Sequence, residues 1–193
     1  MAGTSPSPFG AALNHVSVDL ETLGTVADAV ILSIGAVRFD PDTNQIDDDG
    51  FYRCISIDSN LDYKRRIQED TLVWWMKQSP AAQKVFHEPN KVSLETALCE
   101  FSDWLGGTDS FMWGNGADFD QPMLALAYTQ TTVPIPWKFW NNRCLRTLKN
   151  LPAAKNVTVP RLSTHHNALQ DAIYQAQLIQ AIFAAMNGKK VKT

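Results

Sequence analysis

Two acidic side chains end an alternating apolar run near the start of the chain. The stretch from His15 to Gly24 reads His-Val-Ser-Val-Asp-Leu-Glu-Thr-Leu-Gly and contains Asp19 and Glu21. Side chains two positions apart lie on the same face of a β-strand, so these two carboxylates are neighbours. Neighbouring carboxylates resist ionising together unless a cation lies between them. The pair therefore indicates a divalent-metal site; the alternative is a solvated strand end that enters a turn.

A second acidic position follows a short predicted strand at 110–114. The sequence there is Gly114-Asn-Gly-Ala-Asp-Phe-Asp120. Open α/β sheets bind ligands at the carboxyl ends of their strands, so Asp120 can face the Asp19 and Glu21 pair. The alternative is a first-turn acid that interacts favourably with a helix dipole. Asp118 is expected to point away from the side that Asp120 occupies.

The third position is His165-His166-Asn-Ala-Leu-Gln-Asp171. Inside one helix, His166 and Asp171 would point about 140° apart. If Asn167 caps the helix, His166 lies in the preceding loop and Asp171 in the first turns, and both reach the same helix end. The alternatives are a surface histidine and an acid that only interacts with the helix dipole.

The elements that must position these residues are predicted from periodicity and turn signals. We expect β-strands in the run that ends at the acids and at 29–39, 51–57 and 110–114. We expect helices at 70–78, from the Ser79-Pro80 cap onward, and at 94–105, 121–129, 144–151 and 167–186. The pattern predicts an α/β fold: an antiparallel meander extended by parallel strands into a mixed sheet, with helices packed on it.

Length and composition predict one domain. The chain has 193 residues, of which 45% are hydrophobic, enough for one full core. We expect a flexible lead-in at 1–13, a single domain at 14–187 and a basic tail at 188–193. The three cysteines are far apart in the sequence and suggest neither a disulfide framework nor a zinc site.

Charge and hydropathy exclude other classes. The net charge of −3 argues against non-specific coating of duplex nucleic acid. Because the chain lacks both an apolar run of about 20 residues and a secretion signal, we expect no membrane partner and a cytoplasmic location.

Taken together, the three motifs are far more specific than any one of them. Asp-x-Glu, Asn-x-x-x-Phe-Asp and His-x-x-x-x-Asp occur in an order and spacing that resemble the DEDDh 3′-5′ exonucleases of the ribonuclease-H-like superfamily. The likeness is closest to the branch of phage DexA-type, exodeoxyribonuclease VIII-like and mycobacterial exoribonuclease-like proteins. It covers about residues 14 to 186, and the stretches that carry it are Trp74–Ser79, Trp113–Asp120 and Phe139–Thr147. One departure is Cys144, where these relatives carry an acid.

The resemblance implies a ribonuclease-H-like fold and a two-metal phosphodiester hydrolase. Carboxylates suit Mg²⁺ or Mn²⁺, and two such ions can activate water and hold the leaving oxygen. The resemblance implies that Asp19, Glu21, Asp120 and Asp171 hold two ions, with Asp19 touching both. It also implies that His166 is the general base that accepts the proton of the attacking water.

The substrate is expected to be the 3′ end of single-stranded DNA or RNA. The expected products are nucleoside 5′-monophosphates. Aromatic residues can stack on bases and basic residues can bind phosphates. The resemblance places Thr22 near the 3′ hydroxyl and Leu23 as a wedge against the terminal base. One of the adjacent tryptophans Trp74 and Trp75 must lie in the core, because helix neighbours point about 100° apart. The candidate substrate-binding residues are Thr22, Leu23, Trp75, Asn115, Phe119, Arg143 and Arg146; the alternative for the aromatic and basic ones is core packing or a solvated face.

Two other functions remain open on the sequence. One is a catalytically silent nucleic-acid-binding module of the same fold, and the other is a metal-dependent endonuclease. The expected setting is a bacterial or phage-infected cell. Related enzymes are often homodimers, which makes the aromatic segment 135–140 a candidate interface.

Overall fold

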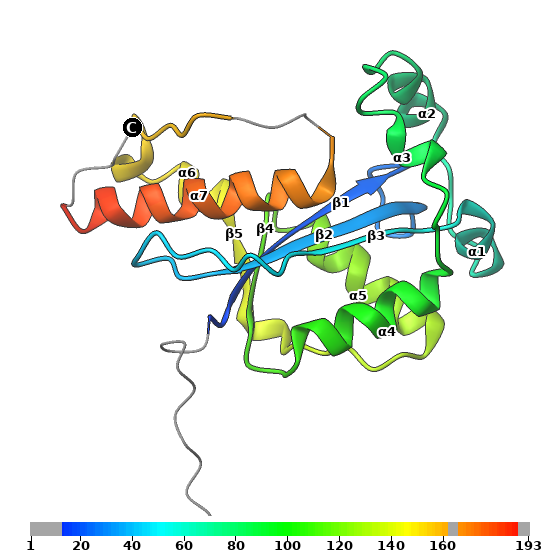
Figure 1. The fold of residues 1–193 in the computed structure, drawn as a ribbon, viewed down its shortest axis with the longest axis horizontal. Helices are drawn as coiled ribbons and strands as arrows, with labels where there is room; N and C mark the ends of the chain where they lie inside the picture. Colours follow the sequence, from blue (N-terminus) through cyan, green and yellow to red (C-terminus); the bar gives the residue numbers. More distant parts are fainter. Residues whose placement is uncertain (1–12, 162–165, 189–193) are drawn as a thin grey trace, which may run out of the picture.

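β1 (His15–Thr22) lies at the centre of a five-stranded sheet with the strand order β3-β2-β1-β4-β5 (Figure 1). The computed structural model describes residues 13–161 and 166–188. The other strands are β2 (Ile31–Phe39), β3 (Phe51–Cys54), β4 (Phe111–Gly114) and β5 (Asn142–Cys144). β1, β2 and β3 pair antiparallel, whereas β4 pairs parallel with β1, and β5 pairs parallel with β4. This confirms the predicted mixed sheet of ribonuclease-H-like type.

Helices cover both faces of the sheet. In Figure 1, α7 lies on one side of the sheet, α4 and α5 lie on the other, and α2 and α3 lie beyond the end of β1. The helices are α1 (Ile57–Asp62), α2 (Glu69–Met76), α3 (Lys84–His87), α4 (Leu94–Leu105), α5 (Asp120–Thr131), α6 (Leu145–Lys149) and α7 (Ala168–Met186), with 3₁₀ turns η1 (Phe139–Asn141) and η2 (Pro152–Ala154).

The alternation in β1 decides which layer each of its side chains joins. Val16, Val18 and Leu20 are buried in a core cluster with residues of α4 and α5. Asp19 and Glu21 therefore project from the opposite face of the strand, where α7 packs. The apolar side chains of β1 thus pack in the core, and the two acids on its other face are available to bind ligands.

Local sequence signals fixed several elements as predicted. The α4 helix has the expected bounds, because Ser93 accepts a hydrogen bond from the Thr96 backbone N–H and Gly106 ends it in the left-handed conformation. The α7 helix begins after Asn167, whose side chain accepts a hydrogen bond from the Gln170 N–H. The cap places His166 before the helix and Asp171 in its first turn, as the sequence predicts.

Other predicted elements were wrong in their bounds. The third strand ends at Cys54 rather than 57, because Ser56 caps α1, a helix that the β-branched run concealed. The helix predicted at 70–78 runs from Glu69 to Met76 as α2, with Gln68 as its N-cap and Asp70 in its first turn. The Ser79-Pro80 segment forms turns, and α3 begins only at Lys84.

Three further elements also differ from the prediction. The α5 helix starts one residue earlier than predicted, at Asp120, and ends at Thr131. The helix predicted at 144–151 is shortened to Leu145–Lys149 because it is preceded by the unpredicted strand β5, and Cys144 is its N-cap. These bounds move the ends of the elements without changing the layer order.

The predicted lead-in and basic tail lie almost entirely outside the described residues, so their expected flexibility stays a prediction. Among the residues that the structure describes, no helix is both long and apolar enough to cross a bilayer.

Gly35 permits the close packing of α7 on the sheet. Gly35 pairs with Asp19 across β1 and β2. A Cβ at Gly35 would lie 2.1 Å from the Leu169 backbone nitrogen and 2.1 Å from the Ala168 carbonyl carbon, and neither is a flexible side-chain end. The absence of a side chain therefore lets the first turn of α7 pack closely on β2, at the position that pairs with Asp19.

We expect Gly35→Ala to displace the start of α7 and to impair both stability and activity. Overpacking of this kind costs about 1–3 kcal/mol, and misplaced site groups lower turnover about 10-fold to 100-fold. Thermal unfolding and nuclease assays measure the two effects. Gly107→Ala is the matched control, because a Cβ at Gly107 would have nothing within 4 Å. Equal melting temperatures and equal turnover in Gly35→Ala and Gly107→Ala would contradict the role of Gly35 in the packing of α7.

Candidate active site

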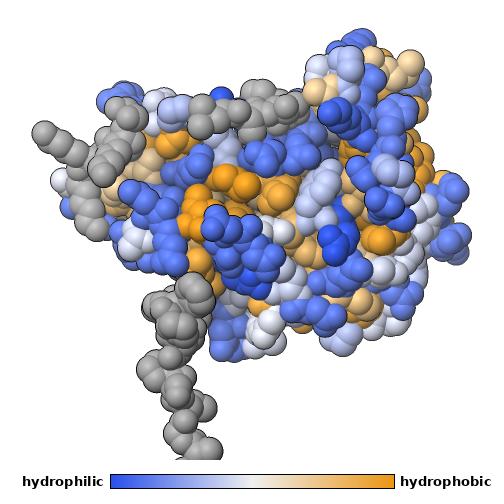
Figure 2. All heavy atoms as spheres, in the orientation of Figure 1, coloured by the Kyte–Doolittle hydropathy of each residue, from blue (hydrophilic) through white to orange (hydrophobic). Residues whose placement is uncertain are grey.

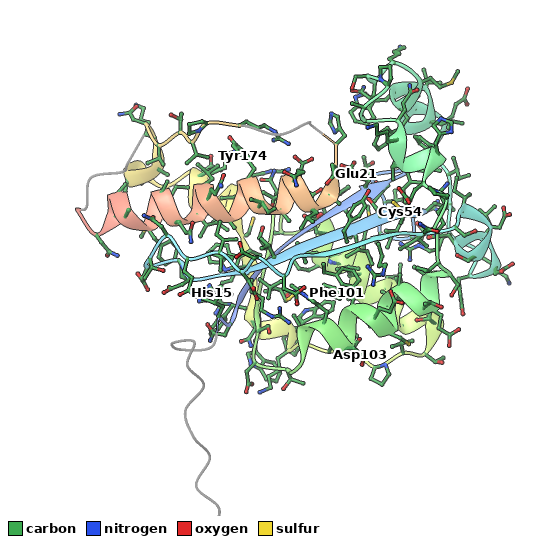
Figure 3. All side chains as sticks on the ribbon, in the orientation of Figure 1. His15, Glu21, Cys54, Phe101, Asp103 and Tyr174 are labelled. Carbon is green, nitrogen blue, oxygen red and sulfur yellow. The ribbon has the colours of Figure 1, made fainter. Side chains whose placement is uncertain are left out.

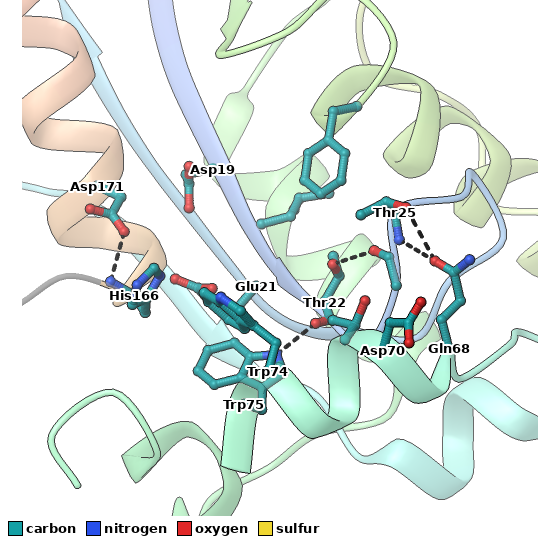
Figure 4. Close-up of a pocket in the computed structure, with 14 residues that line it drawn as sticks. Asp19, Glu21, Thr22, Thr25, Gln68, Asp70, Trp74, Trp75, His166 and Asp171 are labelled. Atoms are coloured by element: carbon teal, nitrogen blue, oxygen red, sulfur yellow. Dashed lines mark hydrogen bonds between the residues drawn. The ribbon is translucent and has the colours of Figure 1, made fainter. Parts of the chain in front are cut away.

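The site is a cavity of about 540 Å³ between the carboxyl end of β1, the start of α7 and the inner face of α2. Figure 4 shows Asp19 and Glu21 on β1, Asp171 on α7, and Trp74 and Trp75 on α2 across from them. The cavity is lined by Asp19, Leu20, Glu21, Thr22, Gly24, Thr25, Gln68, Asp70, Thr71, Trp74, Trp75, Phe119, His166 and Asp171. Residues from three motifs far apart in the sequence thus meet at one place.

Glu21, His166 and Asp171 form the tightest group of potential ligands. Each offers one ligand atom, and these three atoms lie within 4.8 Å of one another. The His166 backbone N–H donates a 3.0 Å hydrogen bond to Asp171 Oδ2, which ties the loop to the helix. His166 has φ 65°, a left-handed conformation that is uncommon for a residue other than glycine. Such strain at a pocket is typical of functional residues.

Asp120 completes the acidic set from α5. It is the first residue of α5 and is 2% exposed, and Asp120 Oδ2 accepts a 3.0 Å hydrogen bond from the Asn115 N–H. Its charge repels those of both Asp19 and Glu21, so the three carboxylates lie close together. Asp120 does not line the cavity itself, whereas the exposed Asp118 lies outside the group.

Burial and mutual repulsion perturb these acids strongly. Burial, followed by repulsion from Asp120, raises the pKa of Glu21 to about 8. Burial raises the pKa of Asp120 to about 6, against hydrogen bonds from backbone N–H groups. The pKa of Asp19 is raised well above its usual value, first by burial and then by Asp120 and Glu21. Groups that disfavour each other's charge to this degree are suited to hold cations.

Arg161 and Gln175 belong to the site but were not predicted from the sequence. Arg161 forms an ion pair with Asp171, and its charge opposes the rise in the pKa of Asp19 and Glu21. Gln175 Nε2 donates a 2.6 Å hydrogen bond to Asp19 Oδ1. A signal for Gln175 existed, because it lies four residues after Asp171 and so on the same helix face. Arg161 is on the loop that leads toward His166, and no local pattern marked it.

One tryptophan of the pair lies in the core, as the sequence predicts, but the buried one is Trp75, the candidate substrate residue, and the exposed one is Trp74. Trp75 is 2% exposed and its Nε1 donates to the Thr22 carbonyl, whereas Trp74 is 42% exposed. The Trp74 ring meets the His166 ring edge-on with centroids 4.9 Å apart. Thr22 lines the cavity and its Oγ1 donates to the Gly24 carbonyl. Leu23 is 1% exposed in a core cluster with Trp75, so its side chain does not line the cavity.

The remaining predicted substrate residues separate into two groups. Phe119 lines the cavity, and Asn115 contacts Asp120 through its backbone. Arg146 is exposed next to this edge, since a Cβ at Gly116 would lie 3.4 Å from its Nη1. Arg143 is placed elsewhere: its guanidinium lies 4.7 Å from the Phe111 ring centroid and its charge lowers the pKa of His15. His15 and Glu21 lie at opposite ends of β1 (Figure 3), so the structure does not bring Arg143 to the acids.

The residues present fit a divalent metal. Glu21 Oε1 is buried and has no hydrogen-bond partner among the described residues. Buried polar atoms without a partner are rare in native proteins and often mark an ion or water site. Carboxylate oxygens are the ligands that Mg²⁺ and Mn²⁺ prefer.

The raised pKa of Glu21 predicts how the metal-free protein responds to pH. Because the folded protein binds this proton more tightly than the unfolded chain, the resulting stability is present below pH 4.5 and is lost as pH rises toward about 8. In EDTA we therefore expect the melting temperature to fall between pH 5 and pH 8. Added Mg²⁺ or Mn²⁺ should raise it more at pH 8, where the ligands are deprotonated.

Differential scanning fluorimetry of the wild type and Glu21→Gln measures this effect. The neutral variant serves as the control, because it removes the titrating group while keeping its shape. In EDTA, the melting temperature should fall more steeply between pH 5 and pH 8 for the wild type than for Glu21→Gln. A melting temperature in EDTA that rises from pH 5 to pH 8 relative to that of Glu21→Gln would contradict the prediction.

Comparison with known proteins points to nucleases. The exodeoxyribonuclease of enterobacteria phage T4 is 27% identical over 154 residues, covering 67% of this chain and 68% of the phage protein. The crystal structure of cell-death related nuclease 4 superposes with a TM-score of 0.49 and 11% identity over 86% of this chain and 62% of that one. The latter likeness is too weak to assign an activity.

The family match covers most of the chain. The model of the 3′-5′ exoribonuclease Rv2179c-like domain matches residues 14–183, a span that contains every acid of the site as well as His166. The expected exonuclease family and the expectation of an enzyme are thereby confirmed. The chain is a nuclease that belongs to the family of Rv2179c-like 3′-5′ exoribonuclease domains.

Proposed function

We propose that the protein is a metal-dependent 3′-5′ exonuclease that releases nucleoside 5′-monophosphates from the 3′ end of single-stranded DNA or RNA. The observation that carries the proposal is that Asp19, Glu21, His166 and Asp171 line one cavity, with Asp120 close enough for its charge to repel those of Asp19 and Glu21. The family match supports the reaction class. The metal count, the base and the substrate are our inference.

Asp19, Glu21, Asp120 and Asp171 would hold two Mg²⁺ or Mn²⁺ ions. When bound, such ions activate the attacking water and stabilise the leaving oxygen. The protein contributes the ligands and their rigidity. β1 supplies the half-buried Asp19 and the buried Glu21, and α5 supplies the buried Asp120. The α7 helix, which packs directly on Gly35, supplies the fourth acid.

His166 is the proposed general base. It lies at the cavity on the loop before α7, with its backbone tied to Asp171 and its ring against Trp74. In the reaction the water oxygen bonds to phosphorus and the P–O3′ bond breaks. His166 takes the proton of the water, and the 3′ oxygen of the shortened chain takes up a proton from solvent. The released nucleotide therefore keeps its phosphate on the 5′ oxygen.

The α2 wall offers a surface for the terminal base. Trp74 presents an exposed ring to the cavity, and stacking on an aromatic ring contributes about 1–3 kcal/mol per base. The same helix exposes Leu72, Val73 and Met76, and Figure 2 shows hydrophobic surface over the α2–α3 corner. Trp75, in the core, holds the Thr22 backbone through the hydrogen bond from its Nε1. Phe119 also lines the cavity. We assign Arg146, next to Gly116, to binding a phosphate of the substrate.

Digestion of matched linear and circular single strands tests the proposal. DNA and RNA oligonucleotides of one sequence, labelled at the 5′ end in the linear strands and at an internal position in the circles, are incubated with Mg²⁺ or with EDTA. We expect shortening from the 3′ end of the linear strands in Mg²⁺ only, with 5′-monophosphates as products. Cleavage of the circles would favour the endonuclease, and binding without mononucleotide release would favour the silent module; either would overturn the proposal.

The same assay decides the sugar preference. The family model is described as an exoribonuclease domain, whereas the phage relative is named an exodeoxyribonuclease. Both polymers are therefore proposed substrates, acted on in the cytoplasm of a bacterial or phage-infected cell.

The homodimer interface also stays a proposal. Within the segment 135–140, Phe139 is 77% exposed and Trp140 is 62% exposed. Two large aromatic side chains at the surface are suited to a protein interface, where such residues are enriched. They lie next to β5, one of the two edge strands of the described sheet.

A further inference from the structure

Gln175 is a buried glutamine aimed at the acids. It lies one turn after Asp171 on α7, on the helix face that packs against β1, and is 5% exposed. Gln175 Nε2 donates to Asp19 Oδ1 at 2.6 Å. Most of the other buried residues of α7 are apolar, so a glutamine at this position needs a reason beyond packing.

The other end of the same amide has no protein partner. Gln175 Oε1 is buried without a hydrogen-bond partner among the described residues, and so is Ser17 Oγ, two residues before Asp19 on the same strand face. A buried acceptor left unpaired carries a desolvation penalty, which an ordered water relieves. Because Oε1 has no such partner, the hydrogen bond from Nε2 to Asp19 is the polar contact that the described residues offer this side chain.

A single donor can fix a carboxylate. Ionised Asp19 has two acceptor oxygens and rotates freely unless a donor binds one of them. With the amide on Oδ1, the plane of the carboxylate is set and Oδ2 is left for another partner. Glutamine suits this role better than lysine or arginine, because a neutral amide donates a hydrogen bond without adding a positive charge that would compete with a metal ion.

We propose that Gln175 is a positioning residue of the metal centre, which fixes the orientation of Asp19 and thereby sets its affinity for divalent ions. The inference rests on the proposed function, because it assumes that Asp19 binds metal. Outer partners that orient metal ligands typically change metal affinity or activity 10-fold to 100-fold when they are mutated.

The chain offers a matched control on the same helix. Gln180 is 6% exposed, and its Nε2 donates to the carbonyls of Asp40 and Gln45, both at 2.9 Å. Gln180→Met therefore removes a buried glutamine and its hydrogen bonds to backbone carbonyls, and it leaves the acids of the site without a lost contact. Gln175→Met removes the donor to Asp19, and Gln175→Asn keeps an amide but shortens the side chain by one carbon–carbon bond, about 1.5 Å.

Calorimetric titration of Mn²⁺ into EDTA-stripped protein is the test, with cooperative thermal unfolding as the check on folding. We expect Gln175→Met and Gln175→Asn to bind Mn²⁺ about 10-fold to 100-fold more weakly than the wild type. At saturating Mn²⁺, kcat for a single-stranded oligonucleotide should fall while KM stays within about twofold. Gln180→Met should lose stability but keep its Mn²⁺ affinity.

The outcomes separate the two proposals. Wild-type Mn²⁺ affinity in both Gln175 variants would overturn the role of Gln175 and leave the proposed function standing. An equal loss of affinity in Gln180→Met would also overturn it, because the effect would then come from weakened helix packing. A wild-type protein that binds no Mn²⁺ would overturn the proposed function and this inference with it.

Discussion

Replacing Asp19 with asparagine is expected to lower turnover by about 10³-fold or more while leaving the fold intact. Asp19 lies on the central strand, hydrogen-bonded to Gln175 of α7 and close enough to Asp120 and Glu21 for their charges to repel it. Asparagine keeps the shape and one acceptor oxygen but removes the charge that a divalent ion needs. Because the substitution also removes repulsion, the metal-free variant should be at least as stable as the wild type.

Single-turnover digestion of a 3′-labelled oligonucleotide and thermal unfolding in EDTA measure the two effects. Asp118→Asn is the matched control, because Asp118 is an exposed acid two residues before Asp120, in the loop that precedes α5. Its turnover should stay within about twofold of the wild-type value. Retained metal-dependent turnover in Asp19→Asn would show that β1 does not carry the centre of the site.

Replacing His166 with asparagine is expected to lower kcat about 10²-fold to 10⁴-fold while preserving metal binding. Asparagine tolerates the left-handed backbone that His166 adopts at φ 65°, so the loop can keep its conformation. The variant loses the imidazole that accepts the proton. It keeps the backbone N–H that donates to Asp171.

Mn²⁺ titration alongside the kinetic assay distinguishes a general-base role of His166 from a metal-ligand role. The Glu21, His166 and Asp171 ligand atoms lie within 4.8 Å, so the metal-free geometry also permits His166 to bind metal. A general base predicts a large loss of kcat with Mn²⁺ affinity unchanged, whereas loss of both together would make His166 a ligand. His87→Asn, at an exposed histidine of α3, is the control and should change neither.

Much of the fold could be predicted because its signals are local. The alternation before Asp19, the cap and apolar stripe of α4, and the Asn167 cap of α7 each depend on a few neighbouring residues. The site followed from strand ends and helix starts, which are the places where a sheet of this type gathers ligands. Helix geometry predicted that one of Trp74 and Trp75 lies in the core, but did not predict that the buried one is Trp75.

The rest depends on contacts between distant segments. Gln175 meets Asp19 across 156 positions of sequence. Its place four residues after Asp171 indicates the helix face on which it lies, but does not indicate its partner. Arg143 turns to Phe111 and Leu23 joins the core beside Trp75, because packing partners and not residue type decide where a side chain points. The strand β5 has only three residues, too short for a periodic pattern.

The position of bound Mn²⁺ tests the central claim most directly. An anomalous difference map from crystals of the wild-type protein soaked in Mn²⁺ and a nucleoside 5′-monophosphate would locate each ion. We predict two ions about 3.5–4 Å apart, held among Asp19, Glu21, Asp120 and Asp171, with Asp19 touching both. Ions bound elsewhere, or none among these four carboxylates, would contradict it.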